Sequence, residues 1–170
     1  MVIWIIGLSG AGKTTLANEV VSRAQKSKCN TILVDGDVIR EIFGNDIGYS
    51  MEDRLTNSKR ISQLCKFLDD QGVNVVCSIL SIFPESRSWN RGNIENYYEV
   101  FIDTPIETLI SRDSKGIYGK YNRGEISQVA GMDIDFPVPV DSDLVIHNDK
   151  TLNHLLGQAG PIIEKLLSGL

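Results

Sequence analysis

The sequence is poor in cysteine, and its three cysteines, Cys29, Cys65 and Cys77, have neither the spacing of a CxxC pair nor that of a metal site. It therefore gives no support to a disulfide framework or to a cysteine-based metal centre. We expect all three to be small buried side chains of a protein that works in a reducing cytoplasm.

Long apolar runs and an excess of positive charge are missing as well. No run approaches the roughly 20 apolar residues of a membrane span. The apolar residues at the start lead straight into a glycine-rich loop, which predicts a strand and not a secretion signal. The formal net charge of −5 argues against a nucleic-acid groove as the main function. We therefore expect a cytoplasmic protein that engages neither a membrane nor a nucleic acid.

What remains is the composition of an ordinary globular protein. The chain has 170 residues, 42% of them hydrophobic and 23% charged, and it contains no repeat or low-complexity segment. This length and composition predict a single domain, 1–170, with its own core. The one loose stretch, 116–140, is rich in glycine, proline and polar residues, and we interpret it as a functional flap because long loops in compact domains usually are functional.

The strongest motif comes first along the chain. Residues 7–14 read GLSGAGKT, which fits the phosphate-binding pattern of a glycine, four residues and Gly-Lys-Ser/Thr. An apolar run over 2–6 predicts the preceding strand, and apolar residues at helical spacing predict the following helix. Glycines let backbone N–H groups turn towards a polyphosphate, and the helix adds its unpaired N–H groups. We expect ATP to be bound by Gly7, Ser9, Gly10, Ala11, Gly12, Lys13, Thr14 and Thr15, with Thr14 also ligating Mg²⁺.

A second strand, predicted over 31–34, ends in Asp35-Gly36-Asp37. Two carboxylates at the carboxyl end of a strand lie at the edge where open α/β sheets bind ligands. Asp37 has an alternative role as the cap of the next helix, predicted over 38–43. Capping would account for one of the two acids but not for both.

The rest of the chain alternates between helical and strand patterns. Five strands that alternate with helices predict an α/β fold, a three-layer sandwich around a five-stranded parallel sheet. The first strand contains Trp4, which we expect in the core. The last helix is expected to break at Gly160-Pro161. Beyond the first two strands, we expect strands at 73–79, 98–102 and 144–146, and helices over 51–71, from Thr104-Pro105, over part of 86–96 and over 151–167.

Several spaced motifs carry a resemblance to a known family. They are Asp35-Gly36-Asp37 with Arg40, Gly48-Tyr49-Ser50 with Asp53-Arg54, Asn57 and Arg60, Asp103-Thr104-Pro105, the run from Arg112 to Tyr118, Gly124-Glu125-Ile126, and Asp143-Leu144-Val145. With these motifs in this order, the chain resembles the adenylylsulfate (APS) kinase family from residue 3 to about 148. Members transfer the γ-phosphoryl group of ATP to the 3′-hydroxyl of adenosine 5′-phosphosulfate. The resemblance implies a P-loop nucleotide-kinase fold with a mobile lid at roughly 112–140, and members are often dimers, so a homodimer is one option.

The resemblance also implies roles for single residues. The catalytic residues would be Lys13, Asp35, Asp37 and Arg112, with Asp37 favoured as the base and with Asp35 and Thr14 at the metal. The acceptor nucleotide would be bound by Asp37, Arg40, Tyr49, Arg54, Asn57, Ser81, Ile82, Lys115, Lys120 and Val129. Other interpretations stay open at two places: a salt bridge between Arg112 and Asp113 or another neighbour, and a solvated helix face for the polar residues after 51.

The sequence departs from the family pattern on the acceptor side. Ile82 and Pro84 replace the proline and the arginine that usually follow the serine at 81, and Asn122 stands where a lid arginine is usual. Val129 replaces the phenylalanine that stacks on the adenine of the acceptor, whereas Tyr49 keeps the opposite aromatic ring. Stacking contributes roughly 1–3 kcal/mol per base, so the preference for a purine is in question.

Four interpretations of the function follow. The first is an APS kinase with a relaxed pocket. The second is a relative that phosphorylates the 3′-hydroxyl of cytidine diphosphoramidate for capsule modification, because a pyrimidine offers less surface for stacking. The third, from a different class, is a nucleotide-binding regulatory module without turnover. The fourth, a nucleoside monophosphate kinase, is disfavoured by the Asp-Gly-Asp and Lys-Gly-Ile-Tyr stretches.

Overall fold

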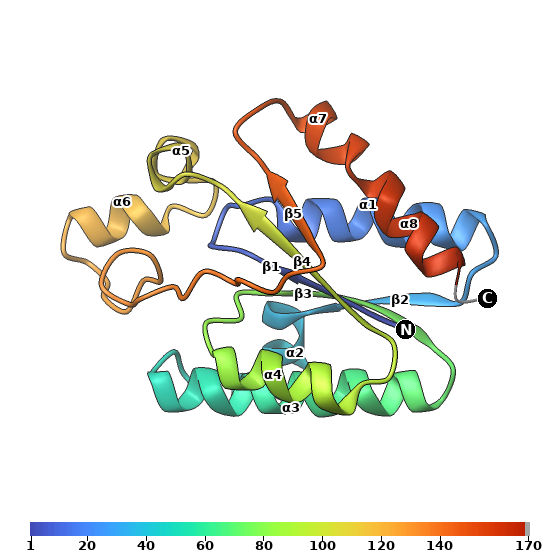
Figure 1. Cartoon of the computed structure of the whole chain (residues 1–170). Helices are drawn as coiled ribbons and strands as arrows, with labels where there is room; N and C mark the ends of the chain where they lie inside the picture. The colour runs from blue at the N-terminus through green and yellow to red at the C-terminus, as the bar shows by residue number, and fades with distance from the viewer. Residues whose placement is uncertain (169–170) are drawn as a thin grey trace.

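The computed structural model describes residues 1–168 and contains a five-stranded sheet with the strand order β2-β3-β1-β4-β5 (Figure 1). Every pairing in it is parallel. This arrangement confirms the predicted α/β sandwich, and it places the end of β1 in the middle of the carboxyl edge of the sheet. The strands are β1 (Val2–Ile6), β2 (Thr31–Asp35), β3 (Asn74–Ile79), β4 (Tyr97–Asp103) and β5 (Leu144–His147).

Helices cover both faces of the sheet (Figure 1). One face carries α1 (Lys13–Lys26), α7 (Leu152–Gly157) and α8 (Ala159–Leu167), and the other carries α2 (Gly36–Ile42), α3 (Met51–Asp70) and α4 (Pro84–Asn93). Two short helices, α5 (Ile106–Arg112) and α6 (Ile117–Asn122), lie beyond the carboxyl ends of the strands. The three-layer body therefore leaves that edge of the sheet to the loops and to these two helices.

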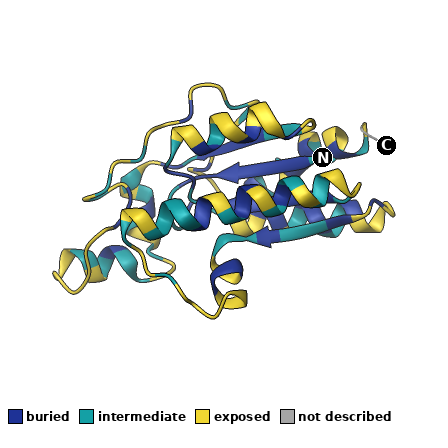
Figure 2. Ribbon diagram, turned by 90° about the horizontal axis from the view of Figure 1, so that it is seen from below, coloured by how far each residue is buried: buried dark blue, intermediate teal, exposed yellow. Residues whose placement is uncertain are grey.

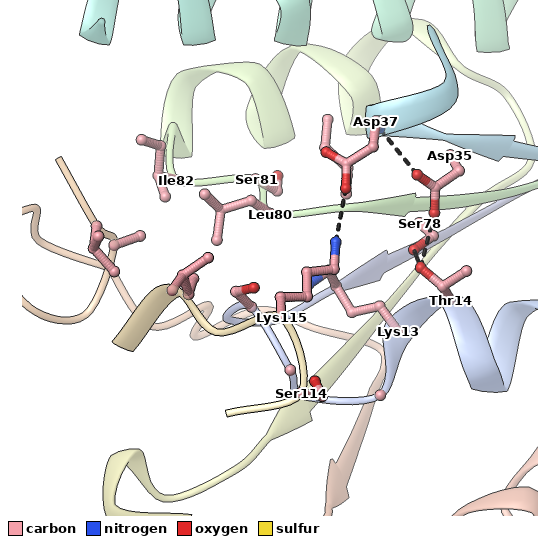
Figure 3. Close-up of a pocket in the computed structure, with 18 of the residues that line it drawn as sticks. Lys13, Thr14, Asp35, Asp37, Ser78, Leu80, Ser81, Ile82, Ser114 and Lys115 are labelled. Atoms are coloured by element: carbon pink, nitrogen blue, oxygen red, sulfur yellow. Dashed lines mark hydrogen bonds and ion pairs between the residues drawn. The ribbon is translucent and has the colours of Figure 1, made fainter. Parts of the chain in front are cut away.

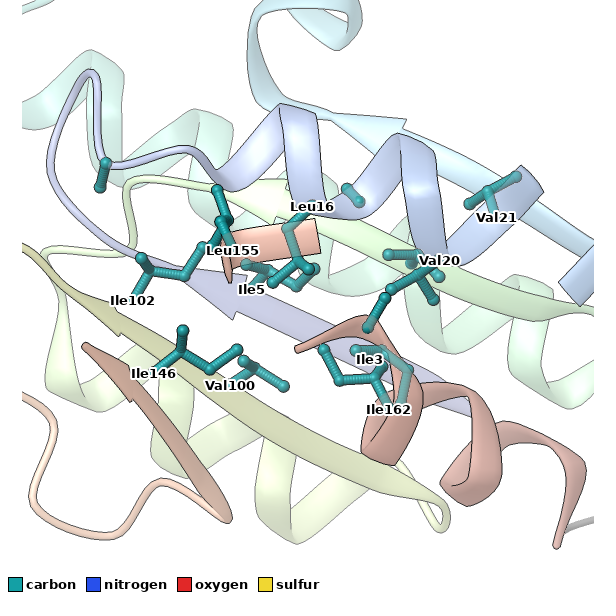
Figure 4. Packing of buried hydrophobic residues seen from close by; sticks show 14 of the residues in the cluster. Ile3, Ile5, Leu16, Val20, Val21, Val100, Ile102, Ile146, Leu155 and Ile162 are labelled. Carbon is teal, nitrogen blue, oxygen red and sulfur yellow. The ribbon is translucent and has the colours of Figure 1, made fainter. Parts of the chain in front are cut away.

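The central strand β1 is buried on both faces, which explains its uninterrupted apolar sequence. Ile3 and Ile5 pack with α1 and α8, and Figure 4 shows them beside Val20 and Ile162. Trp4 belongs to the cluster on the opposite face, with residues of β3 and α3, and it is fully buried as expected. In Figure 2 the central strands are buried while the outward sides of the helices are exposed. The sheet is thus a rigid support for its carboxyl edge.

Helix α3 begins with a reciprocal cap. The Ser50 hydroxyl accepts a hydrogen bond from the backbone N–H of Asp53 at 3.2 Å and donates one to the Asp53 carboxylate at 2.7 Å. A cap of this kind satisfies a backbone donor that the first turn of a helix leaves unpaired. It thereby fixes the first two turns of α3, which carry Arg54 and Asn57.

Some helix boundaries differ from the expectation. The C-terminal helix breaks at Gln158, and Pro161 lies in the first turn of α8, where its missing N–H costs nothing. Pro105 is the N-cap of α5 and not its first residue. The loose stretch 116–140 contains α6, because the Asp113 carboxylate accepts hydrogen bonds from the N–H groups of Tyr118 and Gly119. These features depend on single contacts that composition does not reveal.

All three cysteines are buried and free of disulfide bonds, as expected. Among the helices of residues 1–168, none combines the length and the apolar composition needed to cross a membrane.

We predict that Ser50→Ala lowers the free energy of unfolding by about 1 kcal/mol, because α3 loses its cap. Chemical denaturation measures the change, and Ser88→Ala at an exposed position of α4 serves as the control. Equal stability of the two variants would show that the cap contributes nothing.

Candidate active site

A cavity of about 840 Å³ opens at the carboxyl edge of the sheet. Its walls come from the loop after β1, the ends of β2 and β3, the start of α3, and the segments that follow α5, α6 and β5. Of the residues expected in the site, only Gly7, Ala11 and Lys120 do not line this cavity. The structure thus brings the residues expected for ATP, for the metal and for the acceptor into one space, whereas their individual roles stay predictions.

The loop after β1 has the left-handed backbone that its glycines permit. Gly10 has a φ of +78° and Gly12 a φ of +95°. A Cβ at Gly12 would lie 2.6 Å from a methyl carbon of Leu155, so a side chain there would also clash. The Asn148 amide donates to the carbonyl of Ala11 at 2.9 Å and ties the loop to the segment after β5. Ala11 therefore anchors the loop through its carbonyl and does not line the cavity. Asn148 does line the cavity, although the sequence motifs gave it no role.

Lys13 is a half-buried charge of the site. Its ammonium group donates to the carbonyl of Leu8 at 2.8 Å. Burial, together with the positive charge of Lys115, lowers the pKa of Lys13 to about 8, while Asp37 and Asp35 act in the opposite direction. A negatively charged ligand would favour the protonated form, so this lysine is suited to bind an anion.

Three oxygen-bearing side chains meet beside Lys13 (Figure 3). The Thr14 hydroxyl donates to the Asp35 carboxylate at 2.8 Å and lies 3.2 Å from the Ser78 hydroxyl. Hard oxygens of this kind suit Mg²⁺, which typically takes one or two protein ligands and fills its other positions with water and phosphate. The donor set therefore fits the metal predicted at Thr14 and Asp35. Ser78 was missed, although its place near the end of a buried strand is the signal that indicates such a position.

Asp35 and Asp37 have different partners in the structure. The N-cap of α2 is Asp35, whose carboxylate accepts the backbone N–H of Asp37 at 2.9 Å, so the alternative in which Asp37 is the cap was wrong. The reason is that α2 begins at Gly36, two residues earlier than expected. The carboxylate of Asp37 instead accepts a hydrogen bond from Lys115 at 2.7 Å (Figure 3). That bond raises the pKa of Lys115, which therefore stays protonated.

The opposite end of the cavity contains two arginines and one tyrosine. The guanidinium groups of Arg40 and Arg54 lie 4.6 and 5.6 Å from the centre of the Tyr49 ring. Arg54 donates to the carbonyls of Tyr49 and Gln128, both at 2.8 Å, and so bridges two walls. Burial and the nearby charge of Arg40 lower the pKa of Arg54. An anionic group of a ligand would relieve this repulsion.

The first two turns of α3 carry two residues of the cavity wall, Asn57 and Ser58, that have unsatisfied buried oxygens. Asn57 is buried and its amide group donates to the carbonyl of Gly36 at a long 3.5 Å. The Asn57 carbonyl oxygen and the Ser58 hydroxyl have no hydrogen-bond partner within residues 1–168. The alternative of a solvated helix face is therefore wrong for Asn57, whereas it holds for Lys59, which is exposed. Buried polar atoms without partners are costly, and a hydrogen bond from a ligand that reached them would offset this cost.

The segment around Val129 is rigidly held. The Asp133 carboxylate accepts hydrogen bonds from the N–H groups of Gln128 and Val129 at 2.8 and 2.6 Å, and these bonds lower its pKa. Gln128 itself has a φ of +63°. Only 6% of Val129 is exposed, and that part lines the cavity. A short aliphatic wall therefore stands at the position expected to contact the base.

Arg112 lines the cavity as well. Its guanidinium donates to the carbonyl of Lys150 at 3.2 Å. A salt bridge with Asp113 was the alternative, but both Asp113 oxygens accept backbone N–H groups of α6. Lys150 and Ser114 also line the cavity and were not expected there. Lys120 is exposed on α6, outside the cavity.

Comparison with known proteins agrees with this geometry. A family model described as "Adenylylsulphate kinase" matches residues 1–147. The chain is 39% identical over 165 residues to the cytidine diphosphoramidate kinase of Campylobacter jejuni, a match that covers 97% of this chain and 95% of that protein. It is 38% identical over 161 residues to the adenylyl-sulfate kinase of Chloroflexus aurantiacus, covering 92% and 87%.

Solved structures give the same result. The APS kinase CysC of Mycobacterium tuberculosis, in complex with AMPPNP and APS, has a TM-score of 0.89 and 32% identity, and the match covers 98% of this chain and 96% of that one. The shikimate kinase of Aquifex aeolicus, at a TM-score of 0.58 and 16% identity with both chains fully covered, shows the shared fold alone.

We predict that ATP binding takes up a proton at pH 8.5. Lys13 in the free protein is then largely neutral, and the phosphates restore its charge, so uptake should reach about half a proton or more. The affinity for ATP should accordingly fall as the pH rises above about 8. Calorimetry in buffers of different ionisation enthalpy measures the uptake.

The uptake should be much smaller at pH 7, where Lys13 is already charged in the free protein. It should also vanish in Lys13→Arg, because a guanidinium stays protonated throughout this range. Equal uptake at both pH values, or uptake that survives the substitution, would contradict the assignment to Lys13.

Proposed function

Since this chain belongs to the adenylylsulphate kinase family and is a phosphotransferase of that family, we propose that it phosphorylates the 3′-hydroxyl of cytidine diphosphoramidate with ATP. The observation that carries the choice of acceptor is the short, buried wall at Val129. Adenosine 5′-phosphosulfate is the second candidate, because the relatives include APS kinases at nearly the same identity.

The proposed chemistry begins with the ATP end of the cavity. The backbone of the loop after β1 and the Lys13 ammonium hold the phosphates, and Thr14 and Asp35 hold Mg²⁺, directly or through water. Bound there, Mg²⁺ supplies charge neutralisation on the phosphate oxygens. Arg112 and Lys115 add positive charge around the γ-phosphoryl group.

Asp37 acts as the base in this proposal. The 3′-oxygen of the acceptor forms a bond to the γ-phosphorus, the bond from that phosphorus to the bridging oxygen of ADP breaks, and the hydroxyl proton passes to the Asp37 carboxylate. Lys115 lies 2.7 Å from that carboxylate. It must therefore turn away from Asp37 as the acceptor enters, and its ammonium group is then free for the transferring phosphoryl group.

The acceptor end favours a pyrimidine with an anionic 5′ group. Arg40 and Arg54 supply paired positive charge for the diphosphate oxygens. Tyr49 supplies one aromatic ring, while Val129 offers a small apolar surface that a pyrimidine can contact. The unpartnered oxygens of Asn57 and Ser58 accept N–H or O–H groups, and the amide nitrogen of a phosphoramidate is a donor that a sulfate lacks.

We expect Asp37→Asn to lower kcat by about 10²- to 10⁴-fold, because the base is lost. ATP affinity should stay within about twofold, since the substitution leaves the phosphate-binding loop intact. Asp70→Asn, which changes an exposed carboxylate at the end of α3, is the matched control and should retain full activity. A regulatory module without turnover would instead show no kinase activity before or after either change.

We expect Val129→Phe to raise the ratio of kcat/KM for adenosine 5′-phosphosulfate over cytidine diphosphoramidate by about tenfold, because a ring stacks better on the larger base. Val129→Leu adds bulk without a ring and should leave the ratio nearly unchanged. If the leucine variant shifts the ratio as far as the phenylalanine variant, space and not stacking determines the preference.

A further inference from the structure

Ser81 is held in a backbone conformation that serine rarely adopts. Its φ is +56°, and it lies just after β3, between Leu80 and Ile82 (Figure 3). A non-glycine residue keeps such a backbone only where its surroundings determine it, and such residues gather at ligand sites. Ser81 is 3% exposed and lines the cavity. Two residues outside the cavity wall supply the determining contacts.

The first contact comes from Trp4 in the central strand. Its indole N–H donates to the Ser81 hydroxyl oxygen at 3.1 Å, and both side chains are buried. An indole nitrogen can only donate, so the Ser81 oxygen accepts in this bond and its own hydrogen is left for another partner. Within residues 1–168, the Ser81 hydroxyl donates to no protein acceptor. The free hydrogen is therefore available on the cavity side.

The second contact comes from Arg87 in α4. Its guanidinium donates to the carbonyl of Ser81 at 2.9 Å and to the carbonyl of Pro137 at 3.3 Å. One side chain thus holds the strained backbone of Ser81 and joins it to the segment that follows the rigid loop around Val129. Neither Arg87 nor Trp4 lines the cavity.

We propose that Trp4 and Arg87 are positioning residues for the acceptor: Trp4 orients the Ser81 hydroxyl so that it donates to the nucleotide, and Arg87 fixes the backbone that carries it. The inference rests on the proposed function, because it needs an acceptor nucleotide in the cavity. Trp4, a fully buried residue of the central strand, thus has a role in substrate binding in addition to its role in the core.

A double-mutant cycle tests the role of Trp4, using whichever of the two acceptors the unmodified enzyme phosphorylates. Trp4→Phe and Ser81→Ala should each raise KM for the acceptor by about three- to tenfold, the effect of one hydrogen bond. KM for ATP should stay within about twofold in both. The double variant should match Ser81→Ala, because Trp4 acts only through that hydroxyl.

The matched control is Val2→Ala, which truncates a fully buried residue of the same strand and the same core cluster without a contact to Ser81. It should lower stability and leave the acceptor KM unchanged. Arg87→Met should raise the acceptor KM alone, as Trp4→Phe does. The proposal is overturned if Val2→Ala raises the acceptor KM as much, if the Trp4 and Ser81 effects multiply, or if Arg87→Met has no effect.

A fluorescence measurement covers the case in which Trp4→Phe does not fold. In Trp89→Phe, Trp4 is the remaining tryptophan. Acceptor binding should change its emission, because donation by the Ser81 hydroxyl strengthens the bond that the oxygen accepts. The additional change Ser81→Ala should abolish this response, and a response that persists overturns the proposal. Absence of turnover with both acceptors would instead refute the proposed function, so the two failures are distinct.

Discussion

A buried ammonium group that needs an anion is the feature on which the rest of this site depends. Lys13 follows the glycine loop after the central strand and lines the cavity, where burial and the charge of Lys115 lower its pKa to about 8. At the far end, Arg40 and Arg54 lie against one tyrosine ring and repel each other. Positive side chains thus gather in the cavity, as the proposed binding of two phosphorylated ligands requires, although the whole chain carries a net charge of −5.

Two carboxylates of the site, Asp35 and Asp37, partly balance this positive charge. Asp35 pairs with Thr14 and caps α2, and Asp37 pairs with Lys115. Each carboxylate therefore accepts a hydrogen bond from one side chain of the cavity wall, Thr14 for Asp35 and Lys115 for Asp37. Arg54 makes a second link across the cavity, from the start of α3 to the carbonyl of Gln128. In the proposed function, entry of the acceptor would therefore act on the segment from 112 to 140, which carries Lys115 as well as Val129.

The sequence predicted what local patterns determine. Neighbouring residues were enough to predict the apolar run of β1, the glycines of the phosphate-binding loop and the two acids at the end of β2, and the structure places them together. Contacts between distant segments were not predictable in this way. Asn148 holds Ala11 from 137 positions away, and the bond from Trp4 to Ser81 spans 77 positions.

Errors at helix ends have the same origin. Asp35 and not Asp37 caps α2, because α2 begins at Gly36, and the C-terminal break falls at Gln158, because Pro161 fits the first turn of α8. In both cases, packing decides at which of two nearby residues the helix begins. The roles of single site residues came from the family resemblance, and the structure supplies their proximity.

The most direct test of the account is a competition between the two acceptors. Cytidine diphosphoramidate and adenosine 5′-phosphosulfate are offered at equal concentration with ATP and Mg²⁺, and phosphorus NMR identifies each product and the position of its new phosphate. We predict 3′-phosphorylated cytidine diphosphoramidate in at least about tenfold excess, which is about 1.4 kcal/mol in transition-state free energy. A tenfold excess of the adenine product, or a phosphate at any position other than the 3′-oxygen, would contradict it.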